Sequence, residues 1–327
     1  MRTDSRVDDR VTSQYPRVSV IVPVRNCREF IHEAIASICQ QDYQNLEVIV
    51  VDDGSTDYDY RLLAEIDSRI RVIRLSGNGV SVARNAGMRN ASGDYIAFLD
   101  ADDVWFPGKL TAQLRYFKAH PDVGCVFGGF IRWQPEPGGN FPPAASLMSD
   151  CSACTTCETA RSGWIYTRLL TGLLVGMNTA VIRRSVFDQM GGFDESMRIG
   201  EDYLFWLKVS RVYEMHALDC SVALYRIHGS SAMSQVSDDN HQAILLSTAV
   251  SRWGLANPDG TSLSLPDYNR HVAKSEFTHG YKHFWHGDAA IARRAFRRAF
   301  SGRFMPFRSA AYYLATFVRG LVRAQRT

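Results

Sequence analysis

Apolar residues in the first part of the chain form short runs that alternate with stretches of helical spacing. The runs at 18–22 and 47–51 are nearly continuous, as in strands buried on both faces of a parallel sheet. Between them, apolar residues recur over 31–38 at the i, i+3, i+4, i+7 positions of a helix. The same patterns predict strands at 71–75, 95–99 and 123–127, a poorly patterned helix at 58–68, and helices around 82–86 and 110–117. This alternation predicts a doubly wound, mostly parallel α/β sheet.

The pattern is lost over 128–159, where a dense group of Pro and Gly residues predicts a loop. Order returns with a strand at 179–184, a helix end and glycine turn at 187–193, a helix that begins at Glu201, and a strand at 222–227. The first strand is expected to stop at Pro23. Residues 238–327 are predicted to be helical, with a turn at 286–288.

The chain has 327 residues, of which 46% are hydrophobic and 22% charged, an ordinary composition for a soluble globular protein. Its net charge of +3 is too small to suggest a nucleic-acid binder. No run of 18 apolar residues and no signal-peptide core is present, so we expect a cytoplasmic protein. Seven scattered cysteines also favour a reducing compartment.

Charge is distributed unevenly, because residues 281–327 hold ten Lys and Arg and one acidic residue. This segment therefore carries +9, which leaves −6 for the rest of the chain. Aromatic and apolar residues alternate with arginines over 304–326. Such a segment is either a helix packed on the main domain with an arginine-rich solvent face, or a surface for an anionic membrane.

Three carboxylates end the segment GDYIAFLDADD at 93–103. Asp100 and Asp102 point the same way, because side chains along an extended chain repeat every second residue. Clustered carboxylates repel each other unless a cation lies between them, and oxygen ligands suit Mg²⁺ or Mn²⁺. The alternative is a solvated acidic loop that caps the next helix.

Several of these polar residues follow predicted strands. Ligands of doubly wound sheets bind outside the carboxyl ends of the strands. One shared site at that edge is therefore predicted, formed by Pro23, Asp52, Asp53, Asp100 and Asp102.

Two weaker signals compete with this interpretation. Gly77-x-Gly79-x-x-Val82 resembles a dinucleotide fingerprint, but it lacks the third glycine and follows the third strand. Three cysteines at 151, 154 and 157 have a spacing that would suit zinc, with Cys220 or a histidine as fourth ligand. The paired Cys-x-x-Cys signature is absent, which favours free cysteines in a mobile loop.

Six segments resemble, in order, the motifs of family 2 glycosyltransferases. They are VSVIVPVRN at 18–26, VVDDGSTD at 50–57, ARNAG at 83–87, GDYIAFLDADD at 93–103, GGFD at 191–194 and ED at 201–202. The resemblance covers roughly residues 17 to 230. It implies the GT-A fold and inverting transfer of a sugar from a nucleotide-diphosphate donor, with a divalent metal (Mg²⁺ or Mn²⁺) as cofactor.

The resemblance also implies roles for residues that bind the donor. The backbone at Pro23 resembles the position that lies against the base, and Asp53 resembles the acid that binds the nucleobase. Arg84 resembles the basic residue near the base and diphosphate. Asp100 and Asp102 resemble the Asp-x-Asp motif, which binds the ribose and the metal.

Two further residues complete the implied site. Asp202 resembles the catalytic base, which takes the proton of the acceptor hydroxyl. His228 resembles a position that approaches the metal or the diphosphate.

The chain departs from the family pattern at two places. Arg25 stands where family members often have Tyr. Processive synthases carry Gln-x-x-Arg-Trp, whereas Ala249 precedes Arg252 and Trp253 here. We therefore expect transfer of one sugar at a time to a glycan or lipid-linked acceptor of the cell surface.

The predicted organisation is a disordered leader at 1–16, a GT-A domain at 17–235 and a helical extension at 236–327. Within the GT-A domain, 17–127 is the nucleotide-binding half and 128–235 the acceptor half. Through 281–327 the enzyme is expected to lie on the inner face of the cell membrane. The alternatives are a nucleotidyltransferase, which would need a Gly-rich phosphate loop after the first strand, and a non-catalytic binding or scaffold protein.

Overall fold

The computed structural model describes residues 15–229 and 236–324. The predicted leader at 1–16 lies almost wholly outside the described residues. The strands are β1 (Val18–Val24), β2 (Leu46–Asp53), β3 (Ile70–Leu75), β4 (Tyr95–Phe98), β5 (Val104–Trp105), β6 (Val123–Trp133), β7 (Val181–Arg183) and β8 (Glu214–Arg226). Longer helices are α1 (Ile31–Cys39), α2 (Val80–Asn90), α3 (Lys109–Ala119), α5 (Arg184–Met190), α6 (Glu201–Val209), α7 (His241–Trp253), α8 (Leu265–His286), α9 (Ala289–Ser301) and α10 (Pro306–Ala324). Short helical turns are η1 (Tyr60–Glu65), η2 (Ala144–Ser146), η3 (Thr159–Arg161), α4 (Tyr166–Leu169) and η4 (Met177–Thr179).

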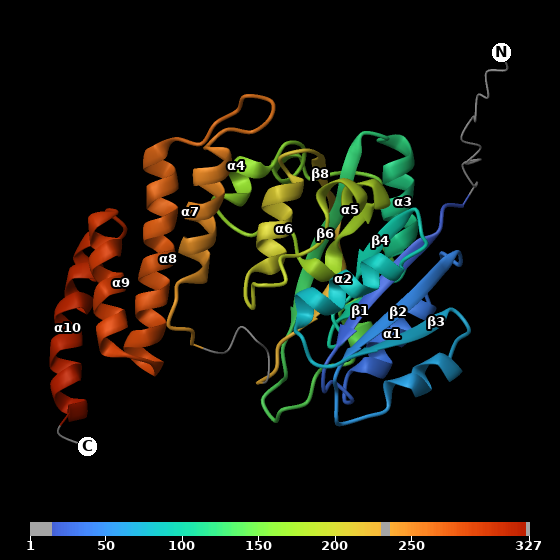
Figure 1. Cartoon of the computed structure of the whole chain (residues 1–327), viewed down its shortest axis with the longest axis horizontal. Helices are drawn as coiled ribbons and strands as arrows, with labels where there is room; N and C mark the ends of the chain where they lie inside the picture. Colours follow the sequence, from blue (N-terminus) through green and yellow to red (C-terminus); the bar gives the residue numbers. More distant parts are fainter. Residues whose placement is uncertain (1–14, 230–235, 325–327) are drawn as a thin grey trace, which may run out of the picture.

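Over the described residues, the strands form one eight-stranded sheet in the order β3-β2-β1-β4-β7-β6-β8-β5. The first four strands in that order are parallel to one another, while β7 and β5 run antiparallel to their neighbours. This arrangement is the predicted mostly parallel α/β sheet (Figure 1).

Both faces of the sheet are covered, as the apolar runs predict. Along β1, Val20 and Val22 face one core with α1 and α3. Ile21 faces the other core, together with α2 and α6. Side chains of a strand alternate between its faces, so a strand covered on both sides must be apolar throughout.

Several boundaries differ from the predictions, among them the strand predicted at 179–184, which forms only over Val181–Arg183. Pro23 does not end β1, which continues to Val24. Pairing of β1 with β4 ends at Ile21, so beyond that point one side of β1 is unpaired and tolerates a residue without an N–H donor. Only the six-residue turn η1 forms within the predicted helix at 58–68. Both β6 and β8 are longer than expected, because they pair with each other across Gly128 and Gly129, where β-bulges interrupt the register.

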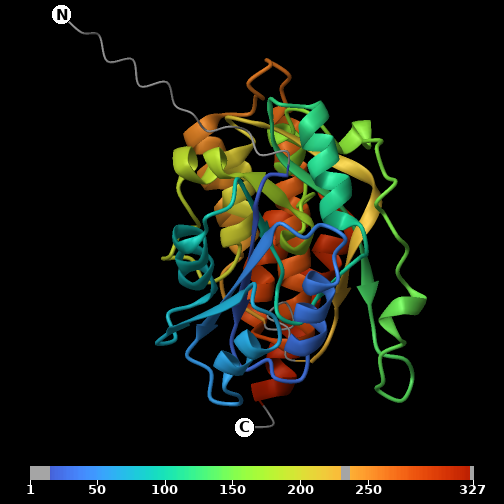
Figure 2. The same cartoon turned by 90° about the vertical axis from the view of Figure 1, so that its right-hand side faces the viewer.

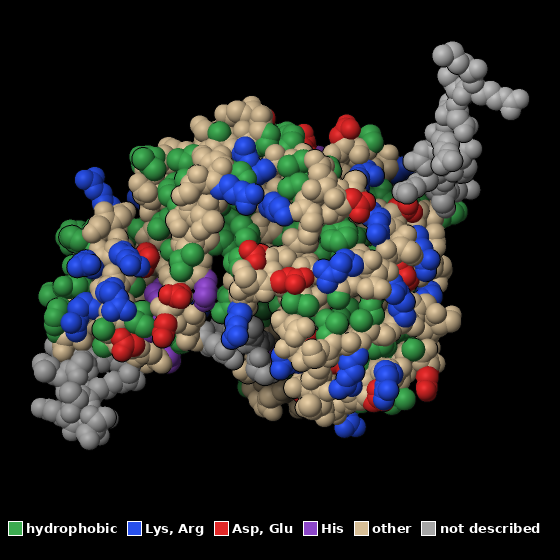
Figure 3. All heavy atoms as spheres, viewed as in Figure 1, with side chains coloured by type: hydrophobic (Ala, Val, Ile, Leu, Met, Phe, Trp, Pro, Cys, Tyr) green, Lys and Arg blue, Asp and Glu red, His purple; other side chains and the backbone are tan. Residues whose placement is uncertain are grey.

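The last four helices lie on the side of the molecule remote from β3 (Figures 1 and 2). The turn predicted at 286–288 separates α8 from α9. α7 packs on the sheet domain, since Leu245, Leu246 and Ala249 belong to the α2–α6 core. α9 and α10 form the outermost layer, and Figure 3 shows Lys, Arg and hydrophobic side chains interspersed there. Within 15–229 and 236–324, no helix is long and apolar enough to cross a membrane.

Candidate active site

The three carboxylates that end the segment 93–103 lie directly after β4, at the carboxyl edge of the parallel strands. β5 follows at once and pairs with β8 through Val104 and Leu224. This pairing brings the end of β8 against the acidic turn. His228 Nε2 consequently lies 2.9 Å from Asp102 Oδ2. The structure thus brings together two predicted site residues that are 126 positions apart.

Arg84 connects this turn to the start of α6. Its guanidinium donates to Asp100 Oδ1 at 2.8 Å and to Glu201 Oε1 at 2.7 Å. The side chain is buried, and it lies over the ring of Phe193 with 5.5 Å between Cζ and the ring centroid. The two carboxylates, and to a smaller extent Asp202, raise the pKa of Arg84 against the opposing effect of burial. Arg84 therefore stays charged and joins three of the sequence motifs.

Asp202 sits in the first turn of α6, where its Oδ1 accepts the N–H of Tyr203 at 2.7 Å. Burial and the neighbouring Glu201 raise the pKa of Asp202 to about 6, although the charge of Arg84 works in the opposite direction. A carboxylate with this pKa is well suited to accept a proton near neutral pH.

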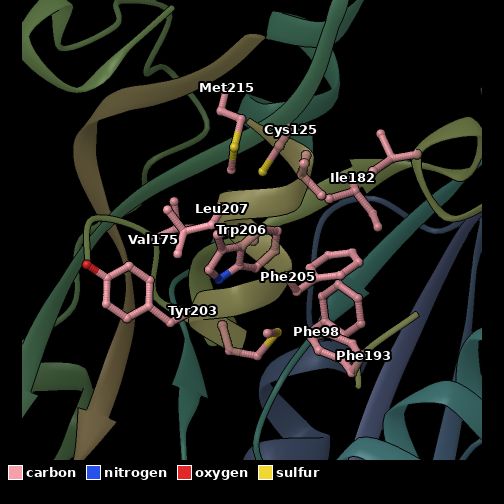
Figure 4. Close-up of a cluster of buried hydrophobic side chains, with 14 of the residues drawn as sticks. Phe98, Cys125, Val175, Ile182, Phe193, Tyr203, Phe205, Trp206, Leu207 and Met215 are labelled. Atoms are coloured by element: carbon pink, nitrogen blue, oxygen red, sulfur yellow. The ribbon is translucent and has the colours of Figure 1, made fainter. Parts of the chain in front are cut away.

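The position of Asp202 is held by the apolar residues that follow it in α6. Phe205, Trp206 and Leu207 are buried, and Figure 4 shows them in the core beside Phe98 and Phe193. The ring centroids of Phe193 and Phe205 are 4.5 Å apart. Because Phe98 ends β4, this packing fixes the start of α6 relative to the acidic turn.

Asp53, at the end of β2, holds the loop before α2. Its two oxygens accept the N–H groups of Asn78 and Gly79 at 2.7 and 2.8 Å. The loop that resembles a dinucleotide fingerprint is therefore bound to a carboxylate of the protein through Asn78 and Gly79. Arg25 approaches the same carboxylate at 3.9 Å. Pro23 is buried two residues before Arg25, at the same edge of the sheet.

A buried network that the sequence patterns did not identify supports the acidic turn. Asp103 accepts Asn178 Nδ2 at 2.7 Å and the N–H of Arg226 at 2.9 Å. Arg226 donates through Nε to the carbonyl of Asp102 at 2.7 Å and through Nη2 to Glu33 at 2.5 Å. Two residues in the sequence could have pointed to this network. They are Asp103, the third carboxylate of the motif, and Arg226, two residues before His228.

Aromatic rings surround the Arg226 guanidinium. Its Cζ lies 3.8 Å from the ring centroid of Trp133, 4.5 Å from that of Phe30 and 4.9 Å from that of Phe141. Phe141 belongs to the segment that was predicted only as a loop. A cavity of about 420 Å³ opens beside Phe30 and His228.

The residues at the acidic turn fit a hard divalent cation held jointly with a substrate. Burial and the nearby Asp100 raise the pKa of Asp102, as expected for crowded carboxylates that a cation would stabilise. Across the described ranges, no group of three or more His, Cys, Asp or Glu side chains is arranged to hold a metal alone. Mg²⁺ or Mn²⁺ would therefore need diphosphate oxygens or water beside Asp102 and His228.

The cysteine alternative has a partial structural basis. Cys220 lies close to Cys151 and Cys154, and hydrogen bonding with their thiols, together with burial, raises the pKa of Cys220. Cys157 faces Leu218 on β8 through an isolated bridge. None of these thiols belongs to a complete metal-ligand group in the part of the chain that the structure describes.

Comparisons with known proteins identify the family and the fold. The model for "Glycosyl transferase family 2" matches residues 19–163. The putative teichuronic acid biosynthesis glycosyltransferase TuaG of Bacillus subtilis is 30% identical over 230 residues, covering 68% of this chain and 84% of TuaG. The glucosyltransferase WfgD of Escherichia coli is 29% identical over 66% of this chain and 79% of its own length. Three uncharacterized glycosyltransferases of Rickettsia also match, and the chain spans about a third of their length.

Solved structures share the fold. TarS 1–349 of S. aureus, in complex with UDP-GlcNAc, superposes with a TM-score of 0.61 at 18% identity, over 92% of this chain and 89% of that one. The mannosyltransferase PcManGT of Pyrobaculum calidifontis gives 0.55 at 21% identity, over 94% of this chain and 88% of that one. With these similarities and the six ordered motifs, the chain belongs to family 2 of the glycosyltransferases and has the GT-A fold.

Proposed function

We propose that this chain is an inverting glycosyltransferase that moves one sugar from a nucleotide-diphosphate sugar to a glycan or lipid-linked acceptor in the synthesis of a cell-surface polysaccharide. The observation that carries the proposal is Arg84, whose guanidinium binds both Asp100 and Glu201. This contact supports the proposal, because the residues expected to bind the donor would then lie beside the carboxylate expected to act as base.

The names of related proteins support the substrate class. WfgD is named as transferring glucose from UDP-Glc to a diphosphoundecaprenol-linked sugar. TuaG is named for teichuronic acid synthesis. The TarS and PcManGT structures contain UDP-GlcNAc, and GDP-Man with Mn²⁺, respectively. A nucleotide-diphosphate sugar is thus named for WfgD, TarS and PcManGT.

In this proposal the base of the donor lies between Pro23 and Asp53, and its ribose near Asp100. Arg84 neutralises Asp100 on the protein side, which limits repulsion between that carboxylate and the diphosphate. Asp102 and His228 would hold Mg²⁺ or Mn²⁺, which supplies a Lewis acid that stabilises charge on the departing diphosphate.

Asp202 removes the proton of the acceptor hydroxyl as that oxygen attacks the anomeric carbon. A single in-line displacement inverts the anomeric centre and requires no carboxylate nucleophile. Glu201 is bound to Arg84, so Asp202 is left as the carboxylate of the pair that can take the proton.

The metal assignment is tested with Asp102→Asn. We expect transfer to be nearly abolished and metal-dependent binding of the nucleoside diphosphate to weaken, because the amide lacks the charge that holds the cation. Transfer and calorimetric titration of UDP and GDP, with and without Mn²⁺, measure both effects.

The control is Asp122→Asn, an exposed acid in the turn after α3. Full activity of Asp102→Asn, or of the wild type in excess chelator, would contradict the assignment of Asp102 as a metal ligand. Binding of nucleotide sugars without any hydrolysis or transfer across a donor and acceptor panel would instead favour the non-catalytic alternative.

A further inference from the structure

The outer face of α10 is apolar and exposed. Phe307 is 91% exposed, Leu314 64% and Phe317 43%. Their spacing of seven and three residues places them on one side of a helix. Exposed apolar stripes of this kind mark interaction surfaces.

The exposure is not the result of a poorly packed helix, because the opposite face of α10 is well packed. The ring of Tyr312 stacks on that of Phe296 with 5.2 Å between centroids, and it contacts the ring of Phe284 at 5.2 Å. Thr316 is buried and accepts a hydrogen bond from Arg293 Nε at 3.1 Å. The helix is therefore anchored on α8 and α9 while Phe307 and Leu314 face outward. The ring of Phe317 is partly covered by Arg293 of α9, with 3.8 Å between Cζ and the ring centroid.

Basic residues border this stripe at the turn between α9 and α10. Arg303 and Arg308 are exposed on either side of Met305, which is itself 44% exposed. Arg294 and Arg297 are exposed along α9. The space-filling view shows this mixture of basic and hydrophobic side chains on the outermost helices (Figure 3).

A cavity of about 690 Å³ lies at the same turn, between α8 and the end of α9. Arg270, Arg298 and Arg303 line it, together with Glu276. Glu276 is 5% exposed, and its Oε2 has no hydrogen-bond partner among the described residues. The cavity therefore offers guanidinium groups to an anion and a buried carboxylate oxygen to a hydrogen-bond donor.

We propose that the α9–α10 hairpin docks on an anionic phospholipid surface and that the cavity binds a phosphatidylglycerol headgroup. Phe307, Leu314 and Phe317 enter the boundary of the acyl chains, as in helices that lie in the membrane interface. Arg303 and Arg308 contact lipid phosphates. A phosphate in the cavity meets the arginines, and a glycerol hydroxyl donates to Glu276.

A second copy of the chain is a less suitable partner. Two copies whose α10 helices met in parallel through this stripe would bring their turn arginines together, which disfavours that contact. The inference rests on the proposed function in one respect, since a lipid-linked acceptor explains why the enzyme would need the membrane.

The test is co-sedimentation of the full chain with vesicles of phosphatidylglycerol in phosphatidylcholine, and with pure phosphatidylcholine vesicles. The wild type should bind the anionic vesicles at low salt, at least tenfold more weakly at high salt, and hardly at all without the anionic lipid. Phe307→Asp with Leu314→Asp, and separately Arg303→Glu with Arg308→Glu, should each weaken binding at least tenfold.

Matched controls are Leu62→Asp with Ile66→Asp, exposed residues in η1 and directly after it, and Arg61→Glu with Lys118→Glu. Each control pair should bind like the wild type. Circular dichroism and turnover on a soluble acceptor verify the fold of every variant and report on the enzyme independently of the membrane. A variant that loses vesicle binding but keeps turnover therefore supports the docking surface and leaves the proposed function intact. A variant that binds vesicles but loses turnover argues only about the proposed function.

Three results would overturn the proposal. They are absence of binding by the wild type at low salt, equal binding to neutral vesicles, and a concentration-dependent dimer that Phe307→Asp with Leu314→Asp abolishes. Vesicles of phosphatidic acid, matched in zeta potential, test the headgroup. The protein should bind these vesicles at least threefold more weakly than those with phosphatidylglycerol. Equal binding would show that the cavity does not recognise the glycerol headgroup.

Discussion

Asp202 is the residue whose chemistry is most open to a direct test. Asp202→Asn preserves the shape of the side chain but cannot accept the acceptor proton. We expect kcat to fall about a hundredfold or more, the usual scale for loss of a general base, while the Kd of the nucleoside diphosphate is retained.

Steady-state transfer assays and calorimetry separate these two quantities. Asp188→Asn, an exposed acid on α5, is the matched control. A collapse of donor affinity with unchanged kcat would make Asp202 a binding residue.

The raised pKa of Asp202 also predicts a pH profile. The base must be ionised, so activity is lost as pH falls through its pKa of about 6 in the free protein. The logarithm of kcat/KM, which reports the free enzyme, should rise with a slope near one below pH 6 and level off above it.

The pH profile needs a wild-type measurement from about pH 4.5 to 8, with stability checked across the range. Asp202→Asn should lose this limb of the profile. A wild-type profile that is flat between pH 5 and 7 would contradict the assignment of the base.

At the scale of residues, the strand ends predicted a shared site that includes Asp100 and Asp102, and the family resemblance added Arg84 and Asp202. The contacts of Arg84 with Asp100 and Glu201 agree with one shared site. Asp103 was grouped with the other two acids, although its carboxylate binds Asn178 and the backbone of Arg226. Spacing alone could not separate these roles, because the direction of each side chain depends on how β5 pairs with β8.

At the scale of elements, Arg84 is the link between α2, the turn after β4 and α6. Arg84→Lys should lower kcat/KM at least tenfold and lower Tm, because one ammonium group cannot span two carboxylates as a guanidinium does. Removing one partner of a buried ion pair costs about 3–5 kcal/mol, and this conservative change should cost part of that.

Arg89→Lys is the control on the same helix. Arg89 is largely exposed and lies 3.4 Å from Glu195, a surface pair worth at most about 1 kcal/mol. Kinetic assays and thermal unfolding compare the two variants. Equal effects of both substitutions would show that the buried bridge has no special role.

Elements with strong periodicity were predicted well, and those defined by long-range pairing were not. The buried runs of β1 and β2 and the helical spacing of α1 are local signals. The extension of β6 to Trp133 depends on its pairing with β8, in which Phe127 lies opposite Ala217, 90 residues further along the chain. Such a distant partner leaves no local trace in the sequence. Residues 58–68 formed only a short turn, which agrees with their weak apolar pattern.

At the scale of the molecule, α8, α9 and α10 are joined by one aromatic cluster. Phe296 is fully buried in it, and its ring contacts those of Phe277 and Phe284. Phe296→Ala should cost about 3–5 kcal/mol and open these helices before the sheet unfolds.

Hydrogen exchange measured by mass spectrometry locates that opening. Phe300→Ala, which removes a half-exposed ring from the same helix, should have little effect. Protection lost equally from β1 and β2 would mean that the helices and the sheet unfold as one unit.

The connection made by α2 has a consequence for building hybrid enzymes. Asn85, next to Arg84, binds the N–H and carbonyl of Phe193 at 2.8 Å each, and a side chain at Gly192 would collide with its amide. The helix α2 and the segment 192–193 therefore fit closely together. A chimera that exchanges the residues after β6 between family members should keep its activity only under two conditions. The incoming segment needs a glycine at the position of Gly192, which leaves room for Asn85, and an acid at the position of Glu201, which pairs with Arg84.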